Sequence, residues 1–191
     1  MNIAIDLDDV LAETMPAIVQ FHNERHGTHF SAADVKTFDV WETFGCSRQE
    51  AIDEIYEFHR TRRDEDLPVI AGARDACAKL AKEHKLFVLT SRRIEFTEQT
   101  NAWIEKHFPG IFSGVSFTNY YSADRKKITK GDVCNEIRAD VFIEDNPAFA
   151  AEAVAPVRQV LLFENFWNRN APLPDGIVRV KSWKEILERL K

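Results

Sequence analysis

NIAIDLDDV, residues 2–10, is the stretch of this sequence that decides the fold. Residues 2–7 are short, apolar and rich in isoleucine, which is typical of a strand buried inside a sheet. After the acidic pair Asp8 and Asp9 the apolar residues recur at helical spacing, and this predicted helix ends at Gly27. The chain therefore opens with a buried strand, an acidic junction and a helix.

The rest of the chain repeats this alternation of short apolar strands and helices. Ser47 and Glu50 form the pattern of a capping box, which predicts a helix from there to about residue 62. Short apolar strands that alternate with helices indicate a Rossmann-like α/β fold, a parallel sheet covered by helices on both faces. Further strands are expected at residues 85–90, 114–118, 141–143 and 159–163, and further helices at residues 73–83, 94–107, 131–137 and 148–155 and after Ser182.

Residues 16–70 are the exception to this alternation, because they contain no predicted strand. At roughly 150 residues per domain, a chain of 191 residues is one domain with an insertion or two small domains. We therefore expect residues 1–15 and 71–191 to form an α/β core domain, and residues 16–70 to form a helical insertion within it.

The composition excludes several classes of protein. Hydrophobic residues make up 45% of the chain and charged residues 29%, which rules out a disordered tail or a fibre. The 25 Lys and Arg residues against 31 Asp and Glu residues give a net charge of −6, which argues against a nucleic acid polymer as a partner. A small phosphorylated ligand is compatible with this charge, because a few local cations or one metal ion can hold it.

Cysteine usage and the amino-terminal residues predict a cytoplasmic protein. The three cysteines, Cys46, Cys77 and Cys134, are widely spaced and odd in number, which favours reduced thiols over a disulfide framework. The first residues lack the basic and apolar segments of a signal peptide, and no apolar run is long enough to span a membrane, so we expect no membrane partner. The sequence leaves open whether the protein is a monomer or a homodimer.

Polar residues follow three of the predicted strands at their carboxyl ends, where open α/β sheets bind ligands. The first strand ends in Asp6-Leu7-Asp8, the second in Thr90-Ser91-Arg92 and a later one in Glu144-Asp145. Four carboxylates in one crevice need a cation or raised pKa values, and hard oxygen donors suit Mg²⁺. Carboxylates, a hydroxyl and a fixed cation together describe a phosphoryl-transfer site. Three lysines upstream of the last acidic pair can supply that cation: Lys126, Lys127 and Lys130.

These motifs resemble the four ordered motifs of the haloacid dehalogenase (HAD) superfamily of aspartate phosphohydrolases. The resemblance is carried by Asp6-Leu7-Asp8-Asp9-Val10, Leu89-Thr90-Ser91, Lys130 and Ile143-Glu144-Asp145. It implies a HAD-type Rossmann-like fold, with residues 16–70 as a small helical cap inserted after the first strand. A narrower resemblance, to the group of 5′(3′)-deoxyribonucleotidases and related nucleotidases, is carried by residues 130–134, 142–146 and 166–169.

The resemblance implies roles for the two aspartates of the first motif. Asp6 would be the nucleophile that forms an aspartyl-phosphate, and its other oxygen would hold Mg²⁺. Asp8 would protonate the leaving alkoxide and then activate water, while its backbone carbonyl binds the metal. We expect the pKa of Asp8 to be raised for this work, since carboxylates crowd around it. Asp9 stands where glycine is common in the superfamily.

The resemblance also implies roles for the later motifs. Thr90 would hydrogen-bond the phosphoryl oxygens, and Lys130 would neutralise the developing charge. Lys127 is the alternative to Lys130, because spacing alone does not separate them. Asp145 would bind Mg²⁺, with Glu144 behind it or acting through water; Glu144 stands where the superfamily often has aspartate.

Several residues are candidates for contact with the rest of the substrate. The aromatic residues of the insertion, Trp41 and Phe44 with Phe38, either stack on a nucleobase or form the core of the cap. Ser91 and Arg92, with Arg93, either contact the substrate phosphate or lie at a solvated helix start. Residues 166–168 (Phe-Trp-Asn) are expected to pack the carboxyl-terminal segment onto the sheet.

The motifs and the resemblance together predict a Mg²⁺-dependent phosphomonoesterase that acts through an aspartyl-phosphate. Its expected substrate is a small phosphorylated metabolite, a nucleoside monophosphate or deoxynucleoside monophosphate. One alternative keeps the mechanism but takes a sugar phosphate or another small phosphate ester. The other alternative is a phospho-acceptor regulatory domain that does not turn over; the insertion and Asp8 argue against it, because such a domain needs neither.

Overall fold

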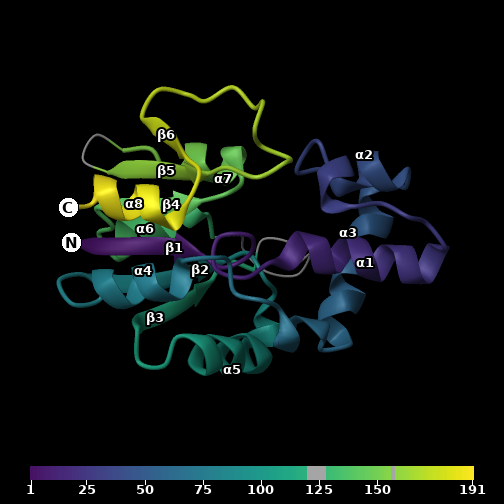
Figure 1. Ribbon diagram of the computed structural model, residues 1–191, viewed down its shortest axis with the longest axis horizontal. Coiled ribbons are helices and arrows are strands. Elements are labelled where there is room, and N and C mark those ends of the chain that lie inside the picture. Colours follow the sequence, from purple (N-terminus) through teal and green to yellow (C-terminus); the bar gives the residue numbers. More distant parts are fainter. Residues whose placement is uncertain (120–127, 156–157) are drawn as a thin grey trace.

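A six-stranded parallel sheet forms the centre of the protein in this computed structural model, which describes residues 1–119, 128–155 and 158–191 (Figure 1). The strands are ordered β3-β2-β1-β4-β5-β6, so β1 lies in the interior of the sheet between β2 and β4. The expected α/β fold is confirmed. The strands are β1 (Asn2–Asp6), β2 (Lys85–Thr90), β3 (Phe112–Phe117), β4 (Val141–Glu144), β5 (Gln159–Phe163) and β6 (Ile177–Val180).

Eight α-helices accompany the sheet in the described part of the chain. Their ends follow local signals in the sequence: Gly27, in the left-handed conformation, ends α1, and Ser47 and Glu50 form the expected capping box of α3. The α-helices are α1 (Thr14–His26), α2 (Val40–Phe44), α3 (Arg48–Arg60), α4 (Ala73–Leu80), α5 (Thr97–His107), α6 (Lys130–Glu136), α7 (Pro147–Glu152) and α8 (Trp183–Arg189), and the short 3₁₀ helices are η1 (Ala32–Asp34), η2 (Arg63–Asp66) and η3 (Ile94–Phe96).

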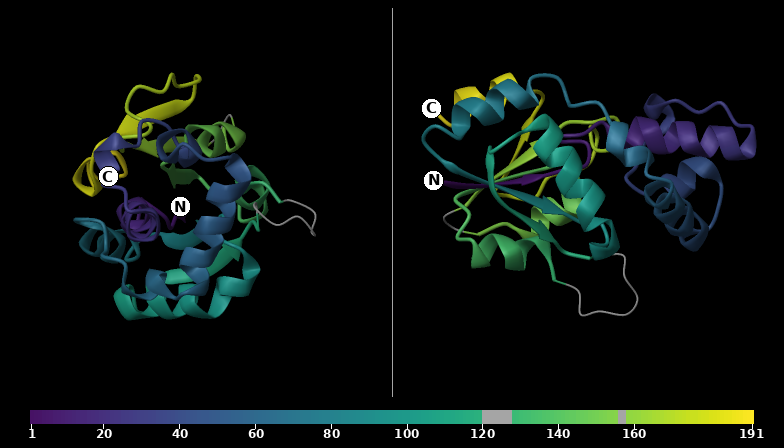
Figure 2. Two further views of the ribbon diagram at one scale, coloured as in Figure 1. Left: turned by 90° about the vertical axis from the view of Figure 1, so that its right-hand side faces the viewer. Right: turned by 90° about the horizontal axis from the view of Figure 1, so that it is seen from below.

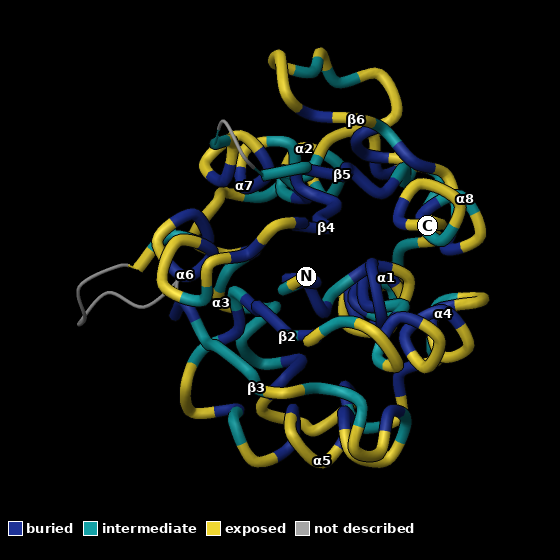
Figure 3. The backbone as a smooth tube through the Cα atoms, turned by 90° about the vertical axis from the view of Figure 1, so that its left-hand side faces the viewer, coloured by how far each residue is buried: buried dark blue, intermediate teal, exposed yellow. Residues whose placement is uncertain are grey.

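Both faces of the sheet are buried, as the continuous apolar strands predict. Along β1, Ile3 and Ile5 belong to one hydrophobic cluster and Ala4 belongs to another, because successive side chains of a strand point to opposite faces. Helices α4 and α8 cover the first face, while α6 and α7 cover the second (Figures 1 and 2). The residues of β1, β4 and β5 are accordingly buried, whereas those of the edge strand β3 are only partly buried (Figure 3).

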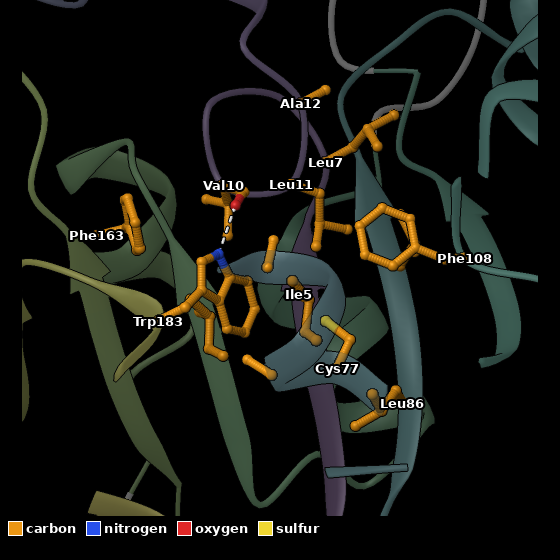
Figure 4. Close-up of a cluster of buried hydrophobic side chains, with 14 of the residues drawn as sticks. Ile5, Leu7, Val10, Leu11, Ala12, Cys77, Leu86, Phe108, Phe163 and Trp183 are labelled. Carbon is orange, nitrogen blue, oxygen red and sulfur yellow. Dashed lines mark hydrogen bonds between the residues drawn. The ribbon is translucent and has the colours of Figure 1, made fainter. Parts of the chain in front are cut away.

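Trp183 ties the carboxyl-terminal helix to the loop that follows β1. Its indole, only 1% exposed, packs in the first cluster, and its Nε1 donates a hydrogen bond to the carbonyl of Val10 at 2.9 Å (Figure 4). A buried indole N–H needs such a partner. The loop that carries Asp8 and Asp9 is therefore fixed by a residue more than 170 positions away.

The strand β6 was not expected from the sequence. It has four residues, its Val178 is exposed, and it lies at the edge of the sheet beyond β5. A short edge strand with one open face lacks the continuous apolar run that marks the inner strands.

Helices α1, α2 and α3 lie together beyond the carboxyl ends of the strands, on the side of the molecule opposite the two termini (Figures 1 and 2). Their side chains form a small hydrophobic cluster, to which Met15, Val19, Val40 and Ala51 contribute together with Trp167 from the segment after β5. In the described residues, none of the helices has the length and apolar character needed to cross a membrane.

Gly131 generates a stability prediction, because a Cβ built there would lie 2.3 Å from the backbone oxygen of Glu152 on α7. We expect Gly131→Ala to lower the free energy of unfolding by about 1–3 kcal/mol, since two helices must move apart to admit the methyl group. Gly114→Ala is the matched control: its added Cβ meets two ring atoms of Phe87, at 3.5 and 3.9 Å, which are ordinary contacts. Urea denaturation of both variants measures the difference, and equal stabilities would show that the two helices are not in close contact.

Candidate active site

The predicted site residues meet because their strands are neighbours. Asp6 ends β1, Thr90 ends β2 and Glu144 ends β4, and β1 pairs in parallel with both other strands. Parallel strands carry their carboxyl ends to one edge of the sheet, as the sequence analysis expected. Asp6, Asp8, Lys130, Glu144 and Asp145 all line one cavity there.

Lys130 lies between two of these carboxylates. Its ammonium Nζ is 2.6 Å from Asp6 Oδ1 and 2.7 Å from Glu144 Oε2, and its side chain is 2% exposed. Burial opposes the charge on Lys130, but the two carboxylates outweigh it and raise the pKa of this lysine. Lys130 therefore stays charged. Lys127, the alternative, lies outside the described residues.

Helix α6 places Lys130 at its first position. The side chain of Thr129 caps this helix by accepting a hydrogen bond from the amide of Asp132. Gly131, the next residue, lets the start of α6 approach the backbone of α7. These local features bring the lysine against the end of β1.

Glu144 and Asp145 differ in how many of their carboxylate oxygens accept hydrogen bonds from the protein. Glu144, fully buried, accepts from Lys130 with Oε2 and from the amides of Asp145 and Asn146 with Oε1. Asp145 accepts a hydrogen bond from the indole of Trp167 at 2.7 Å with Oδ2, whereas its Oδ1 has no donor among the described residues. Asp145 is thus the better placed of the two to offer an oxygen to a ligand.

The charges of this cluster do not balance. Ligand oxygens of Asp6, Glu144 and Asp145 lie within 4.8 Å of one another, and Lys130 supplies one positive charge against three carboxylates. Burial and the neighbouring carboxylates, Glu144 first among them, raise the pKa values of Asp6 and Asp145 far above the usual range. Buried carboxylate oxygens with excess negative charge are the donor set that fits a hard divalent cation such as Mg²⁺.

Asp8 is paired with an arginine, whereas the sequence predicted that carboxylates crowd around it. Arg92 donates to its carboxylate from Nη2 at 2.8 Å and from Nε, and the hydroxyl of Thr14 donates at 2.6 Å. Burial alone would raise the pKa of Asp8, but the charge and hydrogen bonds of Arg92 outweigh burial and lower it to about 2. The expectation of a raised pKa is wrong for this state, because the sequence did not reveal the ion pair with Arg92.

Asp9 caps the helix that follows the first motif. Its carboxylate accepts hydrogen bonds from the backbone amides of Thr14 and Met15, the first residues of α1, and it has a φ of 60°. Aspartate is one of the few residues other than glycine that adopt this left-handed conformation. The departure from the superfamily pattern at this position therefore serves the entry into the helical insertion.

The residues after β2 offer one hydroxyl to a ligand. Ser91 lines the cavity, and its Oγ is buried with no hydrogen-bond partner among the described residues. Thr90 is fully buried, is not among the residues that line the cavity, and accepts from the amide of Arg92 with its Oγ1. A buried unpartnered hydroxyl is costly, so Ser91 Oγ is suited to a hydrogen bond with a bound anion.

Arg92 is not a solvated residue at a helix start. Its side chain is 3% exposed and lies between the carboxylates of Asp8 and Asp64. Arg93 is half-buried and lines the cavity, with its guanidinium over the ring of Tyr56 at 4.5 Å.

The aromatic residues of the insertion separate into two groups. Trp41 and Phe38 line the cavity, which encloses about 690 Å³ between the strand ends and the insertion. Phe44 does not line it: its ring stacks on His22, with 3.8 Å between the ring centroids, inside the insertion. Of the three aromatic residues that the sequence offered for base stacking, Trp41 and Phe38 therefore lie at the cavity and Phe44 does not.

Three residues that support the site, Trp167, Asn168 and Asp64, were not predicted from the sequence as site residues. Trp167 was expected only to pack the carboxyl-terminal segment onto the sheet, but its indole holds Asp145, and Asn168 donates to the backbone oxygen of Asp145 at 2.7 Å. Asp64, which holds Arg92, lies in η2 and carries no motif in the sequence. In each case the signal is a tertiary contact between distant segments, which spacing along the chain does not show.

Comparison with known proteins agrees with this geometry. The family model described as 5' nucleotidase, deoxy (pyrimidine), cytosolic type C protein (NT5C) matches residues 1–190. A nucleotidase of Clostridium acetobutylicum is 23% identical over 97% of this chain and 91% of its own length. A 5'(3')-deoxyribonucleotidase of Bacillus subtilis is 24% identical over 98% of this chain and 97% of its own length.

A solved structure shares the fold. The haloacid dehalogenase-like hydrolase from Streptococcus pneumoniae superposes with a TM-score of 0.69 at 15% identity, covering 100% of this chain and 98% of that one. The resemblance stated from the motifs is thereby confirmed over the whole chain. The chain belongs to the cytosolic type C 5' nucleotidase family of the HAD superfamily and is a phosphoric monoester hydrolase.

Proposed function

We propose that this hydrolase cleaves the phosphate ester of a nucleoside monophosphate or deoxynucleoside monophosphate in two steps, with Asp6 as the nucleophile. The observation that carries the proposal is the buried Asp6 carboxylate at the cavity, with Oδ1 held by Lys130 and Oδ2 free of donors among the described residues. A fixed, desolvated carboxylate is suited to attack phosphorus once a cation bound beside it offsets the burial and the neighbouring carboxylates that raise its pKa. In the first step an oxygen of Asp6 bonds to phosphorus and the ester bond breaks, and in the second step water releases inorganic phosphate.

Lys130 and Ser91 are the groups of this chain that face the phosphoryl oxygens in the proposal. Lys130 is charged and already bound to Asp6, so it stabilises negative charge that develops during attack. Ser91 brings an unpartnered hydroxyl from the next strand end. Thr90 supports the turn beneath them, through the hydrogen bond from the amide of Arg92 to its hydroxyl.

Asp6 and Asp145 are the side chains that would hold Mg²⁺, together with the backbone carbonyl of Asp8. When bound, the ion supplies positive charge that orients the phosphate and offsets the excess negative charge of the cluster. Glu144 has both oxygens occupied by Lys130 and backbone amides, so it holds Lys130 rather than the ion.

Asp8 is proposed to exchange protons with the leaving group and with water. Its pKa of about 2 keeps it ionised in the absence of substrate, which is the form that accepts a proton from the attacking water in the second step. To protonate a leaving alkoxide in the first step, Asp8 must first take up a proton. The negative charge of a phosphate ester bound beside Asp8 would favour that uptake.

The helical insertion, residues 16–70, is proposed to act as a cap that recognises the rest of the substrate. Trp41 and Phe38 provide apolar rings on the wall of the cavity that the carboxylates also line, and the volume of about 690 Å³ is within the range of pockets for small molecules. Rings at this place favour a substrate with a flat base over a small sugar phosphate. We also propose a cytoplasmic location, in keeping with the family and with three free cysteines.

The test of the nucleophile is Asp6→Asn. We expect phosphate release from nucleoside monophosphates to fall below about 1% of the wild-type rate, because an amide cannot form the acyl-phosphate. Asp66→Asn, a change of the same kind at an exposed residue, is the control and should have wild-type activity. Substantial turnover by a folded Asp6→Asn protein would exclude Asp6 as the nucleophile.

Metal binding is tested by two variants that each remove one charge and little volume. Asp145→Asn should raise the Mg²⁺ concentration needed for half-maximal activity about 10-fold or more, because it removes a charged ligand. Glu144→Gln should raise it less than about 3-fold, since its oxygens already accept from protein donors. Activity of the wild type in excess chelator should vanish and return with Mg²⁺; full activity in chelator would contradict a metal-dependent mechanism.

The substrate class is tested at Trp41. Trp41→Leu should raise the KM for a deoxynucleoside monophosphate about 5- to 100-fold, from the loss of base stacking worth about 1–3 kcal/mol. The KM for a small aryl phosphate should change little. Phe44→Leu removes a ring from the same short helix but outside the cavity, so it should melt earlier without this selectivity. Equal effects of Trp41→Leu on all substrates would assign Trp41 to the core of the cap.

A further inference from the structure

Arg92 is buried between two carboxylates that come from distant parts of the chain. Its Nη2 and Nε donate to Asp8, and its Nη1 donates to Asp64 Oδ2 at 2.9 Å. Nη1 also donates to the hydroxyl of Thr100 on α5 at 3.2 Å. A planar guanidinium that is engaged on both sides in this way has little freedom to rotate.

Asp64 is itself held by several donors. It is 1% exposed; Gln99 Nε2 donates to its Oδ1 at 2.7 Å, and His59 Nδ1 lies 3.0 Å from its Oδ2. Gln99 also donates to the backbone oxygen of His59 at 2.9 Å. Because Arg92 and His59 lower the pKa of Asp64 against the effect of burial, this carboxylate stays ionised.

The network joins the insertion to the active site. Asp64 belongs to η2 and His59 to the end of α3, both within residues 16–70, whereas Asp8 and Arg92 follow strands of the core. Asp8 lies in a loop, and its side chain accepts only from Arg92 and Thr14 in the described part of the chain. The place of the Asp8 carboxylate therefore depends on where Arg92 is held, and Arg92 is held by Asp64.

We infer that Asp64 is a positioning residue for the reaction: acting through Arg92, it sets the place from which Asp8 exchanges protons with the leaving group and with water. The inference rests on the acid/base role proposed for Asp8. It assigns to the insertion a part in the chemical step, in addition to the cavity wall. If Asp64 served only stability, its loss would affect all substrates alike.

The test compares an alkyl with an aryl phosphate in Asp64→Asn. An alkoxide needs a proton to leave, whereas nitrophenolate departs almost unaided. A misplaced Asp8 therefore slows hydrolysis of the alkyl ester much more than hydrolysis of the aryl ester. We expect kcat for a nucleoside monophosphate to fall about 10- to 100-fold, since small misplacements of a reacting group can cost that much. The kcat for nitrophenyl phosphate should fall less than about 3-fold, with both KM values nearly unchanged.

Asp66→Asn is the matched control, because Asp66 lies in the same 3₁₀ helix with a side chain that is 92% exposed. It should leave both substrates unaffected. Gln99→Met is a milder second variant that removes one donor to Asp64 and keeps its charge. It should lower the ratio of kcat for the alkyl ester to kcat for the aryl ester by about 2- to 5-fold. This variant tests the inference if Asp64→Asn does not fold.

Asp8→Asn separates the failure of this inference from the failure of the proposed function. If Asp8→Asn itself shows no preference for the aryl ester, the acid/base role of Asp8 is wrong, and the inference falls with it. If Asp8→Asn shows the preference but Asp64→Asn and Gln99→Met slow both substrates equally, or change only KM, Asp64 does not position Asp8. If Asp64→Asn does not fold, an unchanged alkyl-to-aryl ratio in Gln99→Met overturns the inference.

Discussion

The active site depends on one buried set of ion pairs, in which Lys130 lies between the carboxylates of Asp6 and Glu144. Taking three charges out of water is unfavourable unless each is paired at short distance. Both distances are below 3 Å, and the backbone amides after β4 satisfy the remaining oxygen of Glu144. The strand order, the start of α6 and its close contact with α7 are the features of the fold that bring this lysine between the two strands.

The sequence predicted the parts of the site that follow from parallel strands. Asp6, Thr90 and Glu144 end three strands, and any parallel sheet with those strands adjacent would gather them. The environment of Asp8 was not predictable in this way, because it is determined by Arg92, which in turn is held by Asp64 from another segment. The contact of Trp167 with Asp145 was not predicted for the same reason. The strand β6 was not predicted because a short edge strand has a weak apolar pattern.

The residues of the insertion contribute to the site at two places. Trp41 and Phe38 form part of the apolar wall of the cavity. Beneath it, His59 and Asp64 reach back to the core and engage the arginine that follows β2. On the roles proposed for Trp41 and Asp8, attachment at both places links recognition of the substrate to the position of the proton-transfer group.

The charges of the ligand-free site bear on how Asp8 can act as both acid and base. Lys130 supplies one positive charge to three carboxylates, so the raised pKa values of Asp6 and Asp145 favour bound protons in the ligand-free site, which a divalent cation would displace. Arg92 is shared between Asp8 and Asp64. A phosphate monoester then adds about 1.5 to 2 negative charges close to Asp8. Nearby negative charge favours protonation of a carboxylate, while Arg92 stays held by Asp64 and Thr100. In the proposed mechanism, substrate binding therefore promotes the uptake by Asp8 of the proton that the leaving group needs.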